Sequence, residues 1–328
     1  MNKIISLLLS ILLLVTLMAG CGSAAQPTPA ADTSEASLSI VATIFPEYDW
    51  IRQLLGDRAD QVQLTLLLDS GVDLHSYQPT VEDIVKLSGC DMFVYVGGES
   101  DAWVDDALRE ATNPDMIVVD LLDVLGDTVK EEELVDGMEA EDGEDEEEEP
   151  EYDEHVWLSL RNASLLCAVL ADRLAELDPE GAQTYAANAE AYIDRLQALD
   201  GEYQRTVEAA PVKTLLFGDR FPFRYLADDY GLNYYAAFAG CSAETEASFA
   251  IIAFLSGKVD ELGMHSILQI ESSDGSVART IRDTTAAKDQ QILTLDSLQS
   301  VTARDVDNGV TYLAVMEDNL AVLKEALQ

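Results

Sequence analysis

Two of the chain's three histidines lie in loops where a metal ion could be bound. His75 lies in the stretch LLLDSGVDLHSYQPT, after an apolar run, and His155 lies in DEHVWLSL. Neutral imidazole is the commonest nitrogen ligand of divalent transition metals. The two positions therefore predict a metal site, with a loop histidine of no special role as the alternative at each position.

Carboxylates occupy two similar positions in the second half of the chain. Asp219 follows an apolar run in LLFGDRFPF, and Asp296 ends another in ILTLDSL. Ligands of open parallel sheets sit beyond the carboxyl ends of the strands, so both aspartates are candidate metal ligands. A carboxylate at the position of Asp296 is equally suited to capping the helix that follows.

Other charged residues have supporting roles in this interpretation. Glu271, at the end of a further apolar run, is a candidate for holding a ligand in place. Arg161 and Arg220 are expected to be structural counter-ions. The third histidine, His265, precedes its strand and lies at the amino end, so we expect it not to bind metal.

The elements that must position these side chains alternate along the chain. Short apolar runs alternate with amphipathic segments, which argues for parallel sheets buried on both faces. The expected strands are 37–45, 61–69, 91–98, 116–122, 213–219, 232–240, 265–272 and 290–298. The expected helices are 47–57, 80–90, 101–111, 161–177, 221–231, 248–263, 274–286 and 311–327.

The longest periodic segment divides these elements into two equal sets. From Pro179 to about residue 209, apolar side chains recur every three or four residues, which is typical of an amphipathic helix. The predicted fold class is therefore α/β, with two Rossmann-like lobes, each with a mostly parallel four-stranded sheet. Residues 38–178 and 210–328 form the lobes, and a single long helix joins them.

The first residues have the character of a processing signal. Lys3 precedes an apolar run that ends in LMAGC, so residues 1–21 are interpreted as a lipoprotein signal peptide with Cys21 as the lipidated residue. An uncleaved signal anchor is the alternative. Residues 22–37 are small, polar and proline-containing, as expected of a flexible tether. The protein is predicted to be anchored to the cell membrane on its extracytoplasmic face.

The net charge of the chain indicates which classes of partner it can bind. The formal net charge is −43, which argues against nucleic acid and favours cations. Residues 131–154 contain sixteen Asp and Glu and no Lys or Arg, and the remainder is still acidic, with 19 basic against 46 acidic residues. We expect 131–154 to be a solvated loop that concentrates cations near His155, with a purely solubilising loop as the alternative.

The remaining cysteines suggest no disulfide framework. Cys90, Cys167 and Cys241 are odd in number, and their spacing matches no zinc or redox motif. We therefore expect them to be small hydrophobic residues of the core.

Several stretches together resemble the zinc- and manganese-binding lipoproteins of ABC metal importers. They include IVATIFPEYDWIRQLLGD, LLLDSGVDLHSYQPTVEDIVKL, DEHVWLSLRNA and GCSAETEASF, and the resemblance covers essentially the whole mature chain. It implies that His75, His155 and Asp296 bind the metal. The family's third ligand, usually His or Glu, aligns with Arg220, which has no acceptor atom. The neighbouring Asp219, a water molecule or a different ion would then have to complete the site.

The predicted function is therefore high-affinity capture of a divalent transition metal between the lobes and its delivery to ABC permease subunits in the membrane. Zinc is favoured and manganese is the alternative, and the protein is expected to be a monomer. Two other functions stay open. One is a surface metallohydrolase, with Glu271 as its base, and the other is an adhesion or structural lipoprotein with a degenerate metal site.

Overall fold

A computed structural model describes residues 38–138, 151–242 and 246–328. The signal peptide, Cys21, the tether and residues 139–150 of the acidic stretch lie outside the described residues.

In the first sheet the two central strands contain most of the buried residues, whereas the outer strands are more exposed. Its strands are β1 (Leu38–Ala42), β2 (Val62–Leu66), β3 (Met92–Tyr95) and β4 (Ile117–Asp120). They are all parallel and lie in the order β2-β1-β3-β4. The carboxyl ends of these strands therefore meet at one edge, and the loops that carry the candidate ligands start there.

The second sheet repeats this arrangement. Its strands are β5 (Thr214–Arg220), β6 (Asn233–Phe238), β7 (Ser266–Gln269) and β8 (Gln291–Thr294). They are parallel in the order β6-β5-β7-β8, which is the first sheet's order with four added to each number. The prediction of two α/β lobes with four-stranded, mostly parallel sheets is confirmed.

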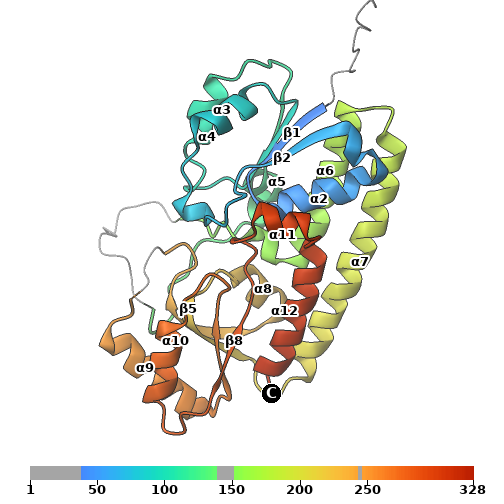
Figure 1. Ribbon diagram of the computed structural model, residues 1–328. Helices are drawn as coiled ribbons and strands as arrows, with labels where there is room; N and C mark the ends of the chain where they lie inside the picture. Colours follow the sequence, from blue (N-terminus) through green and yellow to red (C-terminus); the bar gives the residue numbers. More distant parts are fainter. Residues whose placement is uncertain (1–37, 139–150, 243–245) are drawn as a thin grey trace, which may run out of the picture. The chain divides into compact units, whose positions relative to one another are not determined.

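Helices cover both sheets (Figure 1). In the first lobe they are α2 (Phe45–Leu55), α3 (Val81–Ser88), α4 (Val104–Arg109), α5 (Leu121–Leu125) and α6 (Leu160–Leu177). In the second they are α8 (Arg224–Tyr230), α9 (Phe249–Leu262), α10 (Ser276–Thr284) and α12 (Tyr312–Ala326). The short helix α11 (Ala303–Asp307) begins where the chain is bound to the first lobe.

The long helix α7 (Ala182–Ala209) joins the lobes and packs against both of them. It contacts α2 and α6 of the first lobe and α8 and α12 of the second, and it runs beside α12 in Figure 1. Its buried stripe contains the expected periodic residues Tyr185, Ala189, Tyr192, Leu196, Leu199 and Tyr203.

The chain also returns from the second lobe to the first. The backbone N–H of Ala303 donates to the carbonyl of Asp69 at 2.6 Å, and the N–H of Tyr312 donates to the buried Asp49 carboxylate at 2.8 Å. One hydrophobic cluster includes residues of both lobes. The two lobes are therefore held by more than α7, and we expect only small movements between them.

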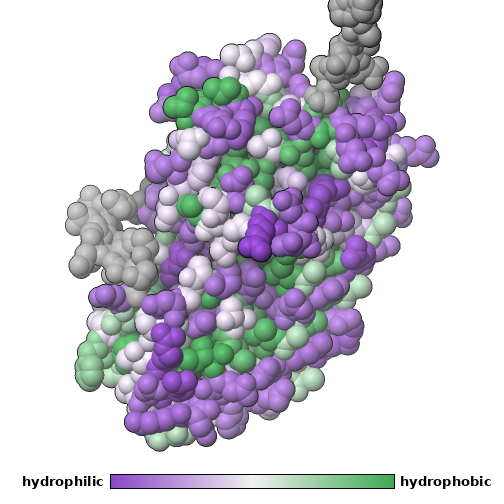
Figure 2. All heavy atoms as spheres, viewed as in Figure 1, coloured by the Kyte–Doolittle hydropathy of each residue, from purple (hydrophilic) through white to green (hydrophobic). Residues whose placement is uncertain are grey.

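The surface agrees with an acidic, water-exposed protein. Hydrophilic side chains predominate on the face drawn in Figure 2, with an apolar patch over α3, where Val81 and Val85 are exposed. Within the described ranges, none of the helices has both the length and the apolar character needed to span a bilayer.

Candidate metal centre

Each of the two predicted histidines is carried by a short, tightly held turn. His75 lies in a one-turn 3-10 helix (Leu74–Ser76), and the Asp73 side chain accepts its backbone N–H at 3.1 Å. His155 directly precedes a second 3-10 turn (Val156–Leu158) whose three side chains are buried. Leu74 in the first turn and the three apolar residues of the second turn are buried, so the backbone that carries each imidazole is held in place.

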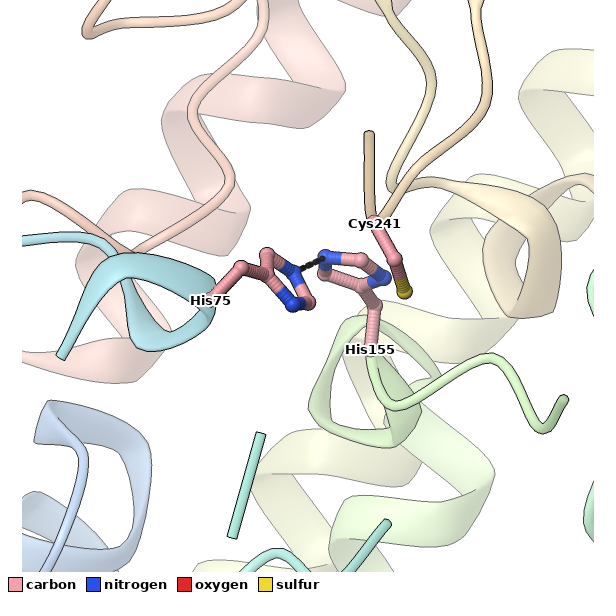
Figure 3. A group of neighbouring side chains, drawn as sticks. All are labelled: His75, His155 and Cys241. Atoms are coloured by element: carbon pink, nitrogen blue, oxygen red, sulfur yellow. Dashed lines mark hydrogen bonds between the residues drawn. The ribbon is translucent and has the colours of Figure 1, made fainter. Parts of the chain in front are cut away.

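The structure brings the two imidazole rings together (Figure 3). The Nε2 atoms of His75 and His155 are 3.1 Å apart, and the ring centroids are 5.0 Å apart. The His155 side chain is 0% exposed and that of His75 is 8% exposed. Two nitrogen ligands of one tetrahedral zinc ion, each about 2.0–2.1 Å from the metal, lie about 3.3 Å apart. The observed spacing is therefore close to that of two ligands of a single ion.

Polar groups hold the outer nitrogen of each ring. His155 Nδ1 is 3.0 Å from Asp153 Oδ1, which also accepts the backbone N–H of His155. His75 Nδ1 is 2.8 Å from Ser100 Oγ and 3.5 Å from a carboxylate oxygen of Glu154. An imidazole that donates its Nδ1–H to such a partner keeps the Nε2 lone pair for a metal. Both rings are therefore oriented as metal ligands.

The proton affinities of the two rings differ. Burial and the neighbouring His155 ring lower the pKa of His75 to about 3. Burial also works against protonation of His155, but the carboxylates of Asp153, Asp73 and Glu154 outweigh it and raise the pKa of His155. His75 is thus neutral and ready to bind a cation at neutral pH, whereas a cation must compete with a proton at His155.

A third potential ligand lies beside the histidines and was not predicted. Among residues 38–138, 151–242 and 246–328, the one group of three or more His, Cys, Asp or Glu side chains with converging ligand atoms is His75, His155 and Cys241. One ligand atom of each lies within 4.8 Å of those of the other two. Cys241 follows β6 and is half-buried, and its side chain lies beside His155 in Figure 3. Cys90 and Cys167 are buried free thiols. The strand-end rule that selected His75 would also have selected this loop.

The loop that carries Cys241 approaches His155 very closely. A Cβ atom on Gly240 would lie 3.2 Å from Cε1 of His155 and 2.9 Å from the carbonyl of Phe221. The backbone N–H of Cys241 donates to Glu132 Oε1 at 2.9 Å. Burial and the carboxylates of Asp153 and Glu132 raise the pKa of the Cys241 thiol. Without a cation beside it, this thiol therefore keeps its proton.

Arg220, an expected counter-ion, joins the two lobes. Its Nη2 donates to Asp73 Oδ2 at 2.6 Å, and its Nη1 donates to the carbonyl of Ser242 at 3.2 Å. The Arg220 and Asp73 side chains are 14% and 18% exposed. Arg161, the other expected counter-ion, pairs instead with Asp200 at 3.1 Å.

The two predicted carboxylate ligands lie outside the histidine group. Asp219 Oδ1 accepts the N–H of Arg220 at 2.9 Å. Asp219, Arg220 and Asp73 also line a cleft of about 510 Å³. Asp296 Oδ1 accepts the N–H of Leu298 at 2.7 Å. Burial and the nearby Glu271 raise the pKa of Asp296 to about 6.

The remaining sequence candidates have local contacts. Glu271 accepts hydrogen bonds from the backbone N–H and hydroxyl of Ser297 and from the hydroxyl of Ser300, so it holds the loop that follows Asp296. His265 is exposed and precedes β7. It is also absent from the group of converging ligands.

Two α/β lobes with a buried pair of converging imidazoles in loops of the first lobe form an arrangement suited to holding a metal ion. A family model described as zinc-uptake complex component A, periplasmic, matches residues 40–326, and the chain belongs to this family.

Relatives with zinc-related names align over almost the whole chain. The chain is 33% identical over 327 residues to the zinc-binding lipoprotein AdcA of Streptococcus pneumoniae, covering 98% of the chain and 61% of that relative. It is 30% identical over 321 residues to the high-affinity zinc uptake system protein ZnuA of Bacillus subtilis, covering 95% of the chain and 94% of the relative. The chain thus spans less than two thirds of the streptococcal protein. The names describe zinc binding and uptake, and the expectation of a binding protein, not an enzyme, is confirmed at the level of the family.

Solved structures share the fold. The Zn(II)-bound ZnuA-like domain of S. pneumoniae AdcA superposes with a TM-score of 0.68 at 29% identity, covering 89% of this chain and 99% of that one. The metal-dependent lipoprotein YcdH of B. subtilis gives a TM-score of 0.70 at 27% identity, covering 88% and 99%. The first of these structures contains zinc.

Proposed function

We propose that this chain is the extracytoplasmic zinc receptor of an ABC importer, which binds one zinc ion through His75 and His155. The observation that carries the proposal is the 3.1 Å separation of two buried Nε2 atoms whose rings are both held at Nδ1. The zinc-related names of the relatives support the choice of metal. Delivery to permease subunits rests on the description of the family as a component of an uptake complex.

The ligand set supports zinc over manganese. Imidazole suits zinc, whereas manganese favours oxygen ligands, and here two imidazoles converge. Asp219 and Asp296 remain predicted ligands from the second lobe. To reach the metal, each would have to release the backbone N–H that it accepts and move toward the histidine pair.

The location of the protein follows from its first residues. We propose that residues 1–21 are removed, that Cys21 carries a lipid, and that residues 22–37 tether the body to the membrane. Lobes 38–178 and 210–328, linked by 179–209, then present the metal site of a monomer to the permease. The lipoprotein name of the streptococcal relative supports this location.

The acidic stretch is proposed to raise the local cation concentration. Its described ends come together in an antiparallel bridge between Glu131 and Tyr152, three residues before His155. The field of many carboxylates extends about 8 Å at physiological salt, so cations held there would lie near the site. A loop that only increases solubility is the alternative, and the deletion described in the Discussion distinguishes the two.

The two other functions are less well supported. A metallohydrolase needs a general base at an open metal position, and Glu271, the candidate base, is engaged by Ser297 and Ser300. An adhesion or structural lipoprotein with a degenerate site would not need a convergent, buried histidine pair.

The zinc content of the purified protein tests the proposal directly. We expect about one zinc per chain in the full-length protein purified without chelators, and a loss of most of it in His75→Ala and in His155→Ala. His265→Ala is the matched control, because this histidine is exposed, and it should retain zinc. Full zinc content in both His75→Ala and His155→Ala would refute the proposed site.

A further inference from the structure

The histidine pair leaves the metal's coordination incomplete. A tetrahedral zinc ion in a protein has three or four protein ligands, and the pair supplies two. Arg220 cannot be a ligand, because its guanidinium has no acceptor atom and is bound to Asp73 and to the Ser242 carbonyl. A third ligand must therefore come from another element.

The loop after β6 is built to bring residue 241 to this place. Because a side chain on Gly240 would collide with the Phe221 carbonyl and press on the His155 ring, only glycine allows so close an approach. Hydrogen bonds fix the backbone on both sides of the cysteine. Glu132 accepts the N–H of Cys241, and Arg220 donates to the carbonyl of the next residue, Ser242.

The distances suit a thiolate ligand. In a tetrahedral site with Zn–S of about 2.3 Å and Zn–N of about 2.0 Å, sulfur and nitrogen lie about 3.6 Å apart. One ligand atom of each of Cys241, His75 and His155 lies within 4.8 Å of the other two, so a small movement of the cysteine side chain and its loop can bring the three to this geometry.

We propose that the Cys241 thiolate is the third zinc ligand, and that Arg220 positions the loop that carries it. As the Zn–S bond forms, the thiol proton passes to solvent, and no oxidation or reduction occurs. This inference rests on the proposed zinc-binding function and names a residue that makes the site selective, because a soft thiolate favours zinc over manganese.

X-ray absorption at the zinc edge tests the inference. The probe is zinc alone, bound to the full-length chain. We expect a sulfur shell at about 2.3 Å that is present in the parent and in Cys90→Ser and absent in Cys241→Ser. Cys90 is the matched control because it is a buried free thiol that is not in the group of converging ligands.

Competition titrations give a second readout. In Cys241→Ser we expect zinc affinity to fall more than about 100-fold, beyond the about 10–100-fold typical of losing a residue that only supports a ligand. Manganese affinity should change by less than about threefold, because manganese gains little from a thiolate.

The outcomes separate the two proposals. Zinc bound by the parent without a sulfur shell, or with a shell that persists in Cys241→Ser, overturns the role of Cys241 and leaves zinc binding by the histidines intact. Failure of the parent chain to bind zinc at all overturns the proposed function and this inference with it.

Discussion

The carboxylate behind His155 offers the sharpest test of how the site works. Asp153 is buried, and its Oδ1 accepts both the backbone N–H of His155 at 2.9 Å and the ring Nδ1–H at 3.0 Å. Asp153→Asn keeps the shape and an acceptor oxygen and removes only the negative charge. The variant therefore isolates the contribution of that charge to zinc binding.

The expected loss can be estimated from the geometry. A carboxylate that accepts from a ligating imidazole raises the basicity of the ring, and removing such a partner typically costs about 10–100-fold in metal affinity. The cost corresponds to about 1.4–2.7 kcal/mol of binding free energy. We expect the loss of zinc affinity caused by Asp153→Asn to lie within this range at a pH at which His155 is neutral.

The pH dependence has a definite sign. Burial opposes the protonation of His155, but Asp153 and its neighbours raise the pKa of the ring, so in the parent a proton competes with zinc as the pH falls through this raised value. In Asp153→Asn the pKa falls and that competition weakens. The ratio of parent to variant zinc affinity should therefore be largest at alkaline pH and should decrease toward acid.

The assay is a competition titration against a fluorescent zinc chelator, repeated from above to below the ordinary histidine pKa of about 6.5. Asp178→Asn is the matched control, because Asp178 pairs with Arg58 at 2.6 Å at the turn between α6 and α7. It should leave zinc affinity unchanged. An affinity ratio for Asp153→Asn that stays constant with pH, or that grows toward acid, would refute the reasoning.

Three further changes probe the surroundings of the site. Arg220→Gln removes the ion pair with Asp73 between the lobes and should lower the unfolding free energy of the zinc-free protein by about 1.5–3 kcal/mol, measured by urea denaturation. Gly240→Ala forces the loop away from His155 and should weaken zinc binding in the same titration. Deleting residues 139–150 should slow cellular zinc uptake when zinc is scarce, if the acidic stretch concentrates cations.

Each of these changes has a control and an opposing outcome. Arg161→Gln removes the ion pairs of a half-exposed arginine with Asp200 and Asp229, each of which should contribute no more than about 1 kcal/mol. An equal cost for both arginine variants would argue against a special role for Arg220. Gly257→Ala lies in α9 with open space around it and should leave zinc affinity unchanged. A neutral insert of equal length replaces 139–150, and unchanged uptake would favour the solubilising alternative.

The fold was predictable because its signals are local. Ile40 and Val41 in β1 belong to an apolar run too short for a helix, and both are fully buried. The spacing of Tyr185, Ala189 and Tyr192 in α7 places them on one face, which is buried. Strand type and helix periodicity do not depend on distant contacts, so the order of elements could be read from the sequence.

The site was predictable only in part. The rule that parallel strands end at one edge predicted loops on the same side of the first sheet for His75 and His155, and the structure brings their rings together. The contact of Cys241 with this pair depends on the packing of one lobe against the other, and no local pattern encodes it. The same holds for the ion pair of Arg220 with Asp73, which joins residues 147 positions apart.

Loop conformations were also beyond the reach of sequence patterns. Leu298 has a φ of 65°, a left-handed conformation that a leucine rarely adopts. It follows Ser297, whose carbonyl accepts the Trp157 indole N–H at 2.8 Å from the other lobe. A contact between the lobes thus adjoins this conformation, and the Leu298 N–H donates to the Asp296 carboxylate.

The bridge between Glu131 and Tyr152 has a consequence for how such receptors diversify. The two chain segments joined by this bridge are both bound to the second lobe. Tyr225 donates to the carbonyl of Asp153 at 2.9 Å and accepts the N–H of Lys130 at 3.0 Å. Whatever the chain contains between residues 138 and 151, these anchors keep His155 in register. That segment can therefore differ in length and in charge without displacing the proposed ligand His155.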